Sequence, residues 1–504
     1  MKSRKALWIF LVLILFAGLM GALYAAESNA EGATITSFPA ALWYTLTTLT
    51  TVGYGDYTPV TLTGRIIGGF IQLCSLGVLA AMIGVILTAF RGTLWPLFRL
   101  SFAKKKKWFV FTANDEASVT LARALTKEDP ETVCLFTGKE EAETPGMKVS
   151  LTPEKLIRFK GDRGTLSVVD MTGAYRPDVQ KESLYYYIQS AYEPAHLSDH
   201  VILFDPSEIL ARLYWHDYPV NLNGEKIVLI GSGKCAESLL EQALLVNITG
   251  KGNFVYHWFG DYEEFFRTHA RLPQILSVGA QVLGKDALYV QKDAWNAEEK
   301  LLREADRIIF LDEDEAKTEE KLVCFLKYFV TEGTVYAKTS YPLDGVIRFG
   351  SPEEIYAPEW VLRTSLNRTA KSMHERYMAQ SGKKTPAWNE LDSFKRRSNL
   401  AAADHLQNKL RILLREENDP APTKENFAEA FRTFENSRGE ERDTYRAIEH
   451  ERWLRFHLLY NWQYSPVRND KEHLHPSLVP FEELTEEERA KDDYGWEILK
   501  NLAE

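Results

Sequence analysis

Two long uncharged stretches near the N-terminus constrain this chain more than any other feature of its sequence. Residues 6–26 and 66–90 carry no charged side chain, and no comparable stretch follows about residue 100. Each is long enough to cross a hydrocarbon core of ~30 Å as a helix. A secretory signal is an alternative for the first stretch, but that stretch exceeds the apolar core of about 7–15 residues found in signals. The sequence therefore predicts an α-helical membrane protein with two spans and a large water-soluble tail.

Basic residues predict how the two spans are oriented. They occupy positions 2–5, before the first span, and positions 91–107, after the second, whereas the connecting segment holds no Lys or Arg before Arg65. Because basic residues concentrate on the cytoplasmic side, both termini should be cytoplasmic, in a plasma (inner) membrane. The run KKKK at 104–107 is expected to lie near anionic membrane lipid.

Composition limits what the tail can do. A chain of 504 residues predicts three or four domains. Its net charge of −10 excludes nucleic acid as an expected partner. The four cysteines are far apart and show no metal-ligand spacing, so thiols in a reducing cytoplasm and no metal site are expected at Cys74, Cys134, Cys235 and Cys324.

Between the two spans lies the segment TTLTTVGYGDYTP, residues 47–59. A cation that leaves water needs oxygen atoms in place of its hydration shell, and backbone carbonyls supply them when successive carbonyls face one axis. That arrangement requires φ > 0 at alternate residues, which glycine tolerates. Glycines alternate here in the pattern of potassium-selective filters, in which four chains build one pore. The sequence predicts a filter with K⁺ as the permeant ion, formed by Thr51, Val52, Gly53, Tyr54 and Gly55.

A short helix is expected just before the filter. Ser37 and Pro39 form an N-cap and first-turn pair. Residues 40–48 are too few to span a membrane, so they indicate a re-entrant pore helix. The carbonyl end of its dipole would favour a cation at the pore centre.

Residues 43–65, WYTLTTLTTVGYGDYTPVTLTGR, closely resemble the pore of prokaryotic two-span potassium channels. The resemblance covers about residues 5–92 and implies a homotetramer. In that family the filter tyrosine packs against aromatic residues, and an aromatic residue of the pore helix hydrogen-bonds the acid after the filter. The resemblance assigns these supporting roles to Trp43, Tyr44 and Asp56, beside the filter's Tyr54.

Two glycines in the second span have two interpretations. Gly77 and Gly84 lie seven residues apart and so share a helix face. They are either the hinge of a cytoplasmic gate or small residues that let helices pack closely.

From residue 107 the pattern changes to short apolar runs that alternate with amphipathic helical periods. Runs of this kind predict parallel, doubly wound α/β lobes. The strands divide near Asn221, and the chain becomes helical and charged from about Ser365. The predicted domains are a pore domain at 1–100, two lobes at 101–220 and 221–355, and a helical region at 356–504.

The second lobe contains a candidate nucleotide site. In KIVLIGSGKCAESLL a strand runs into a GxGxxA turn and a helix, where backbone N–H groups can hold a phosphate. The predicted nucleotide-binding residues are Gly231, Ser232, Gly233 and, for the ribose, Asp261. Asp261 lies 30 residues after Gly231, further than the usual ~20, so a purely structural lobe is the alternative. The acidic run LDEDEAKTEE at 311–320 is expected to complement a helix dipole, and a Ca²⁺ site is its alternative.

Two resemblances concern the tail. Wound lobes directly behind a two-span pore resemble the RCK (TrkA-like) arrangement, which implies a cytoplasmic ring whose ligand moves the pore helices. Residues 385–504 resemble the RyR domain of ryanodine receptors, through positions such as His450, Trp453 and Pro480.

Aromatic and basic residues near the C-terminus predict a ligand pocket. We expect it at Arg452, Trp453, Trp462, Tyr464 and Arg468. Trp453 and Trp462 lie nine apart, so the helix must end before Trp462 if both line one pocket. Aromatic faces and guanidinium groups suit a purine and its phosphates, which suggests a small adenine-containing gating ligand. The alternative is that both tryptophans are core.

The predicted function is a ligand-gated potassium channel rather than an enzyme. One rival is a potassium pore whose tail is an assembly or protein-interaction module. Another is a membrane-anchored oxidoreductase that uses a nicotinamide cofactor at the GSGKCA turn, but that hypothesis leaves the filter unexplained.

Overall fold

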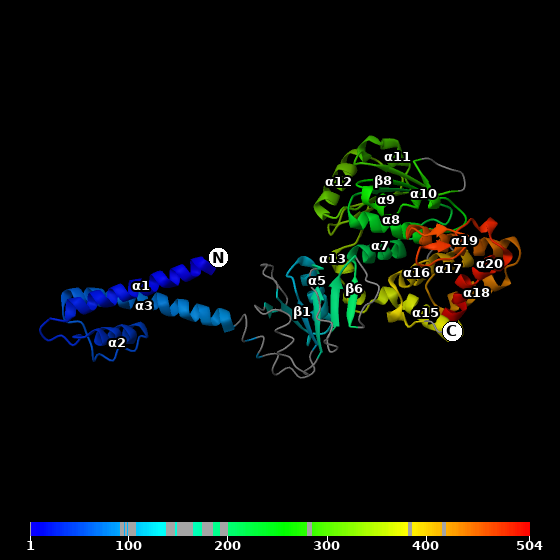
Figure 1. The fold of residues 1–504 in the computed structure, drawn as a ribbon. Helices are drawn as coiled ribbons and strands as arrows, with labels where there is room; N and C mark the ends of the chain where they lie inside the picture. The colour runs from blue at the N-terminus through cyan, green and yellow to red at the C-terminus, as the bar shows by residue number, and fades with distance from the viewer. Residues whose placement is uncertain are drawn as a thin grey trace. The chain divides into compact units, whose positions relative to one another are not determined.

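The computed structural model describes residues 2–90, 95, 98, 107–137, 147–148, 165–173, 185–191, 200–279, 285–381, 386–415 and 420–503. The chain divides into two compact units (Figure 1). The first comprises Met1–Ala103 with Val149–Gly161, and the second comprises Lys104–Lys148 with Asp162–Glu504. The basic run at 104–106 lies outside the described residues.

The helices whose bounds are described in the first unit are α1 (Lys2–Glu27), α2 (Phe38–Leu49) and α3 (Leu62–Ala89). The predicted spans fall in α1 and α3, and the predicted re-entrant helix is α2. Ser37 caps α2 by accepting a hydrogen bond from the Ala40 N–H, and a proline occupies the first turn. Among the residues that are fully described, no helix combines the length and the apolarity needed to cross a membrane.

The described part of the second unit contains two large parallel sheets. The first has the order β3-β2-β1-β4-β5-β6, which is the order of a doubly wound dinucleotide-binding fold. Its strands are β1 (Lys107–Phe111), β2 (Val133–Phe136), β3 (Met147–Lys148), β4 (Thr165–Asp170), β5 (Tyr185–Gln189) and β6 (Val201–Phe204).

The second sheet has the order β13-β12-β11-β7-β8-β10-β9. Followed from its β9 edge, it repeats the order of the first sheet and adds β9 as one extra edge strand. Its strands are β7 (Lys226–Ile230), β8 (Val255–Phe259), β9 (Ser277–Val278), β10 (Ala287–Gln291), β11 (Arg307–Phe310), β12 (Thr334–Lys338) and β13 (Val346–Phe349). The doubly wound prediction is therefore confirmed for both lobes.

Helices of the two lobes meet between the sheets. Figure 1 shows α7 (Pro206–Asp217) beside α8 (Lys234–Val246), the first following the last strand of one sheet and the second following β7. One apolar core continues from the first sheet through both helices to the second sheet. Further helices described in the lobes are α5 (Glu116–Glu128), α9 (Glu263–Thr268), α10 (Leu272–Ile275), α11 (Glu299–Glu304) and α12 (Glu315–Tyr328).

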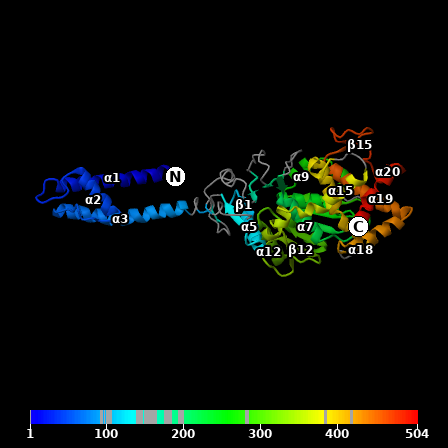
Figure 2. The ribbon, with the colours of Figure 1, turned by 90° about the horizontal axis from the view of Figure 1, so that it is seen from below.

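A helical region completes the second unit. Its helices are α13 (Pro352–Ile355), α14 (Pro358–Val361), α15 (Arg368–Ser381), α16 (Ser393–Asp404), α17 (Leu406–Leu414), α18 (Lys424–Asn436), α19 (Glu440–Leu459), α20 (Glu486–Lys491) and α21 (Tyr494–Ala503). A small ladder joins β14 (Gln463–Tyr464) to β15 (Leu474–His475), and Figure 2 shows the loop that carries β15 projecting beyond α19 and α20.

Buried polar contacts join the helical region to the second lobe. Arg455 on α19 pairs with buried Asp286 (Nη1–Oδ2 2.9 Å), and the His269 imidazole contacts the Leu459 carbonyl oxygen at 2.9 Å. Phe456 belongs to the same apolar core as the two lobes. The predicted boundaries near 220 and 355 consequently fall inside one compact unit.

Candidate functional site

The filter segment has alternating backbone geometry. Thr51, Gly53 and Gly55 have φ of 59°, 55° and 74°, in the left-handed region. The N–H groups of Val52 and Gly53 donate to the Thr47 carbonyl oxygen at 2.9 and 3.1 Å, which ties the segment to the end of α2. A Cβ at either glycine would meet no atom of the described residues within 4 Å. Conformation, rather than space within one chain, therefore favours glycine here.

Trp43 braces this segment. Its Nε1 donates to Asp56 Oδ2 at 2.8 Å, and its ring stacks on Tyr54 with centroids 6.1 Å apart. A hydrogen bond from the pore helix to the acid is what the channel resemblance implies. Tyr44 points elsewhere, since its hydroxyl lies only 2.5 Å from where a Cβ on Gly68 would stand.

Sequence reasoning missed a carboxylate that holds the chain leaving the filter. Glu27, at the end of α1, is fully buried. It accepts hydrogen bonds from the Val60 N–H (2.9 Å), the Thr61 N–H (2.9 Å) and Thr61 Oγ1 (2.6 Å), while Thr61 caps α3. A charged residue at the very end of an apolar stretch was the available signal.

The structure leaves both interpretations of Gly77 and Gly84 open. Both lie in α3, and a Cβ at either would meet no atom within 4 Å in the described chain. The hinge remains a prediction.

The GSG turn follows β7, as predicted, but carboxylates of the same chain contact two of the N–H groups at this turn and the start of α8. The Ser232 N–H donates to Asp312 Oδ1 at 3.1 Å, and the Cys235 N–H reaches Glu313 Oε2 at 3.5 Å. A Cβ on Gly231 would stand 1.6 Å from the Leu311 carbonyl oxygen, so close approach of β11 explains that glycine. A phosphate would have to displace the two carboxylates.

The acidic run around residue 311 supports this turn and α12. Asp314 caps α12 by accepting from the Ala316 N–H at 3.1 Å, and Lys321 Nζ lies 2.9 Å from Asp312 Oδ2. No group of carboxylate, imidazole or thiol ligands suited to a metal occurs among the described residues. Asp261, the predicted ribose ligand, instead donates its backbone N–H to Ser232 Oγ at 2.9 Å.

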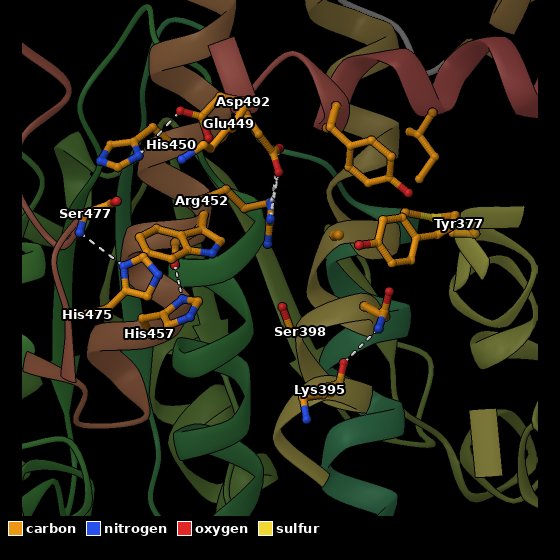
Figure 3. A pocket seen from close by; sticks show the side chains of 18 of the residues that line it. Tyr377, Lys395, Ser398, Glu449, His450, Arg452, His457, His475, Ser477 and Asp492 are labelled. Atoms are coloured by element: carbon orange, nitrogen blue, oxygen red, sulfur yellow. Dashed lines mark hydrogen bonds and ion pairs between the residues drawn. The ribbon is translucent and has the colours of Figure 1, made fainter. Parts of the chain in front are cut away.

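A cavity of about 580 Å³ lies in the helical region, within the usual range of ~300–1,000 Å³ for small-molecule sites. Figure 3 shows His457 and His475 on one wall and Tyr377 on the other. Trp453 packs against both imidazoles, with centroids 4.0 Å from His457 and 4.9 Å from His475. Burial lowers the pKa of His457 to about 3, so this wall is aromatic and neutral.

Charged side chains form the floor of the cavity, defined here as Lys409, Glu449, Arg452 and Asp492. The first three are buried, and Asp492 is partly buried. Glu449 accepts from Lys409 Nζ at 2.6 Å and from Arg452 Nη2 at 2.7 Å. Burial alone would raise the pKa of Glu449, but the two cations hold it well below its usual range. Burial, reinforced by the negative charge of Glu449, raises the pKa of Asp492 to about 7.

Two of the five predicted pocket residues do not line this cavity. Arg452, Trp453 and Arg468 line it. Trp462 is buried core, stacked between Phe394 (5.0 Å) and His473 (5.2 Å). Tyr464 is 58% exposed on β14. The chain does bend before Trp462, since α19 ends at Leu459 and Asn461 has a φ of 59°, but the bend does not bring Trp462 into the cavity.

Comparison with protein families identifies a domain near each end of the chain. Residues 8–92 match the ion channel family, and residues 437–503 match the RyR domain family. The N-terminal segment is therefore an ion-channel pore domain, the C-terminal segment is a RyR domain, and both resemblances are confirmed. The RyR match is shorter than the predicted 385–504.

Among curated proteins the similarity lies in potassium channels. The potassium voltage-gated channel protein Shal of Drosophila melanogaster is 44% identical over 80 residues, which are 16% of this chain and 14% of that protein. The human A-type voltage-gated potassium channel KCND3 is 39% identical over 80 residues, 16% of this chain and 12% of that protein. The chain thus matches only about a seventh of the first relative's length, and the similarity shows homology to potassium-channel pores.

Solved structures resemble the chain only distantly. The GsuK channel bound to ADP aligns over 72% of this chain and 99% of its own, with 14% identity and a TM-score of 0.29. GsuK bound to NAD aligns over 73% and 86%, with 12% identity and a TM-score of 0.28. The shikimate 5-dehydrogenase-like protein HI0607 aligns over 65% and 97%, with 14% identity and a TM-score of 0.27. TM-scores of this size carry no argument about fold or ligand.

Proposed function

We propose that this protein is a potassium-selective channel in the plasma (inner) membrane, with K⁺ as its permeant ion and both termini in the cytoplasm. The observation that carries the proposal is the left-handed backbone at alternate positions, Thr51, Gly53 and Gly55. That alternation is the condition for successive carbonyl oxygens to face one axis. The homology of residues 8–92 to potassium-channel pores supports it.

The proposed channel is a homotetramer. In a single chain the filter side chains Val52 and Tyr54 are 52% and 68% exposed. The α2 side chains Phe38, Leu42 and Leu46 are also large, apolar and exposed. Exposed apolar surface of this extent suits contact with neighbouring subunits and lipid. Four copies around one axis would complete the coordination that one filter strand cannot supply.

We propose further that a small adenine-containing nucleotide gates the channel by binding in the cavity of the helical region. The aromatic wall of Trp453 suits a purine, and the Arg452 and Arg468 guanidinium groups suit phosphates. The cavity is favoured over the GSG turn because Asp312 and Glu313 contact the Ser232 and Cys235 N–H groups at that turn. Through the buried contacts of α19 with the second lobe, ligand binding in the cavity would change the conformation of the RCK-like lobes. That change would in turn move α3 and open or close the pore.

Flux from liposomes tests this function. The purified channel should pass K⁺ in preference to Na⁺, and ADP added on the cytoplasmic side should change the flux. Trp453→Ala removes the aromatic wall and should abolish the response to ADP without abolishing selectivity. Tyr464→Ala is the matched control, because this exposed aromatic does not line the cavity. A selective flux indifferent to ADP would favour the alternative, a potassium pore whose tail is an interaction module.

A further inference from the structure

The floor of the cavity holds a guanidinium with one unused donor. Arg452 is 4% exposed. Its Nε and Nη2 are engaged by Glu449, but its Nη1 is buried and finds no hydrogen-bond partner among the described residues. Figure 3 shows this side chain between the imidazole wall and Tyr377. A buried donor without an acceptor is costly, and an acceptor atom of a ligand would relieve that cost.

The charges around this donor set the cost of bringing in an anion. Burial lowers the pKa of Lys409, and its ion pair with Glu449 opposes that effect. Counted as ionised, Lys409 and Arg452 carry two positive charges and Glu449 carries one negative charge. With Asp492 ionised the floor sums to zero, and with Asp492 protonated it sums to +1. An entering anion is therefore favoured when Asp492 carries a proton.

The neighbours of Asp492 leave it free to take up that proton. Glu449, His450 and Arg452 face it from α19, Lys409 faces it from α17, and Asp493 follows it in the chain. His450 Nδ1 lies 3.6 Å from Asp492 Oδ2. Burial lowers the pKa of His450, so this imidazole is neutral near pH 7 and does not offset the carboxylate. Asp492 Oδ2 accepts no hydrogen bond from the described residues.

We infer that the floor binds the anionic group of the gating ligand at Arg452 Nη1, and that binding is coupled to the uptake of one proton by Asp492. The ligand class is a phosphate ester or anhydride, whose oxygen accepts the unused donor. The inference rests on the proposed function, since it places the phosphates of the nucleotide on the floor and its base against the aromatic wall. It makes the channel respond jointly to ligand and to cytoplasmic pH.

Titration calorimetry of the full-length channel in detergent tests the coupling, with ADP as the probe at pH 6 and pH 8. With a pKa of about 7 for the free Asp492, ADP should bind about tenfold more weakly at pH 8 than at pH 6. Buffers of different ionisation enthalpy should report uptake of up to one proton at pH 8. Asp492→Asn should lose this tenfold contribution to the pH dependence, and it should bind ADP about tenfold more tightly than wild type at pH 8.

Two controls separate titration of Asp492 from other effects. Ionisation of the ADP phosphate near pH 6 is common to both proteins, so the difference between wild type and Asp492→Asn isolates this residue. Glu488→Gln removes a different carboxylate that lines the cavity and should keep the tenfold dependence. Equal pH dependence in wild type and Asp492→Asn would overturn the inference.

Pyrophosphate as a second probe distinguishes this inference from the proposed function. If pyrophosphate binds with proton uptake and ADP does not bind, the anion site stands and the adenine assignment fails. If ADP binds without any proton uptake, the adenine assignment stands and the coupling fails. Absence of binding by both probes would overturn the two together.

Discussion

The filter and the cavity are held in different ways. The filter depends on neighbours in sequence, since Trp43 braces Asp56 and Thr47 receives the Val52 N–H. The cavity depends on side chains from α15 to α21, and its floor joins Lys409 to Glu449 and Asp492. Backbone conformation shapes the first, whereas buried charge shapes the second. A substitution at the filter should therefore change conduction without changing the stability of the second unit. A substitution among the buried charges around the cavity should also lower the stability of the second unit.

The largest effect is expected from Gly55→Ala. Its φ of 74° costs a residue with a Cβ of order 1–2 kcal/mol, and a fourfold pore would incur that cost four times. Selectivity for K⁺ over Na⁺ in liposome flux should collapse, while the thermal unfolding of the second unit should not change. A variant that keeps selective conduction would show that the filter assignment is wrong.

Arg455→Met removes an ion pair that stabilises α19, which lines the cavity, although Arg455 itself does not line it. It leaves Asp286 buried without its cation, which should destabilise the second unit by about 3–5 kcal/mol. Thermal unfolding of the full-length channel measures the loss, and flux should also lose its response to ADP. Arg303→Met is the control, because its pair with Glu299 on α11 is exposed, does not line the cavity and should contribute only ~0–1 kcal/mol. Equal effects of the two variants would contradict the structural role of the buried pair.

The same contrast explains what the sequence could predict. The alternating glycines, the Ser37 cap and the wound strands such as β1 and β7 are local patterns, so they were predicted. Strands β4, β5, β10 and β13 were not predicted, because polar residues or tyrosines interrupt their short apolar runs. Asp492 and Lys409 were missed because only the tertiary fold brings α17, α19 and α20 to one cavity. Trp462 was misassigned because stacking on Phe394, far away in sequence, buries it.

Asp492→Asn should remove a pH dependence of stability. The folded pKa of about 7 exceeds the ordinary value near 4, so the wild type loses stability as pH rises from about 4 through 7. The asparagine variant lacks that titration. Relative to wild type, it should gain roughly 2–4 kcal/mol between pH 4 and pH 8, measured by thermal unfolding of the channel at several pH values. A constant difference across this range would show that Asp492 titrates normally.

The smallest effect is expected from Glu313→Gln at the GSG turn. Glu313 Oε2 lies 3.5 Å from the Cys235 N–H, a contact at the outer limit of a hydrogen bond, and the amide retains an acceptor oxygen. Stability should therefore change by no more than ~0.5 kcal/mol. If the turn were the phosphate site, removing this competing negative charge would tighten ADP binding several-fold. We expect the ADP affinity measured by calorimetry to stay unchanged, because the ligand lies in the cavity of the helical region. A several-fold gain in ADP affinity would indicate that the nucleotide binds at the GSG turn of the second lobe. The Arg452 donor would then bind a different ligand.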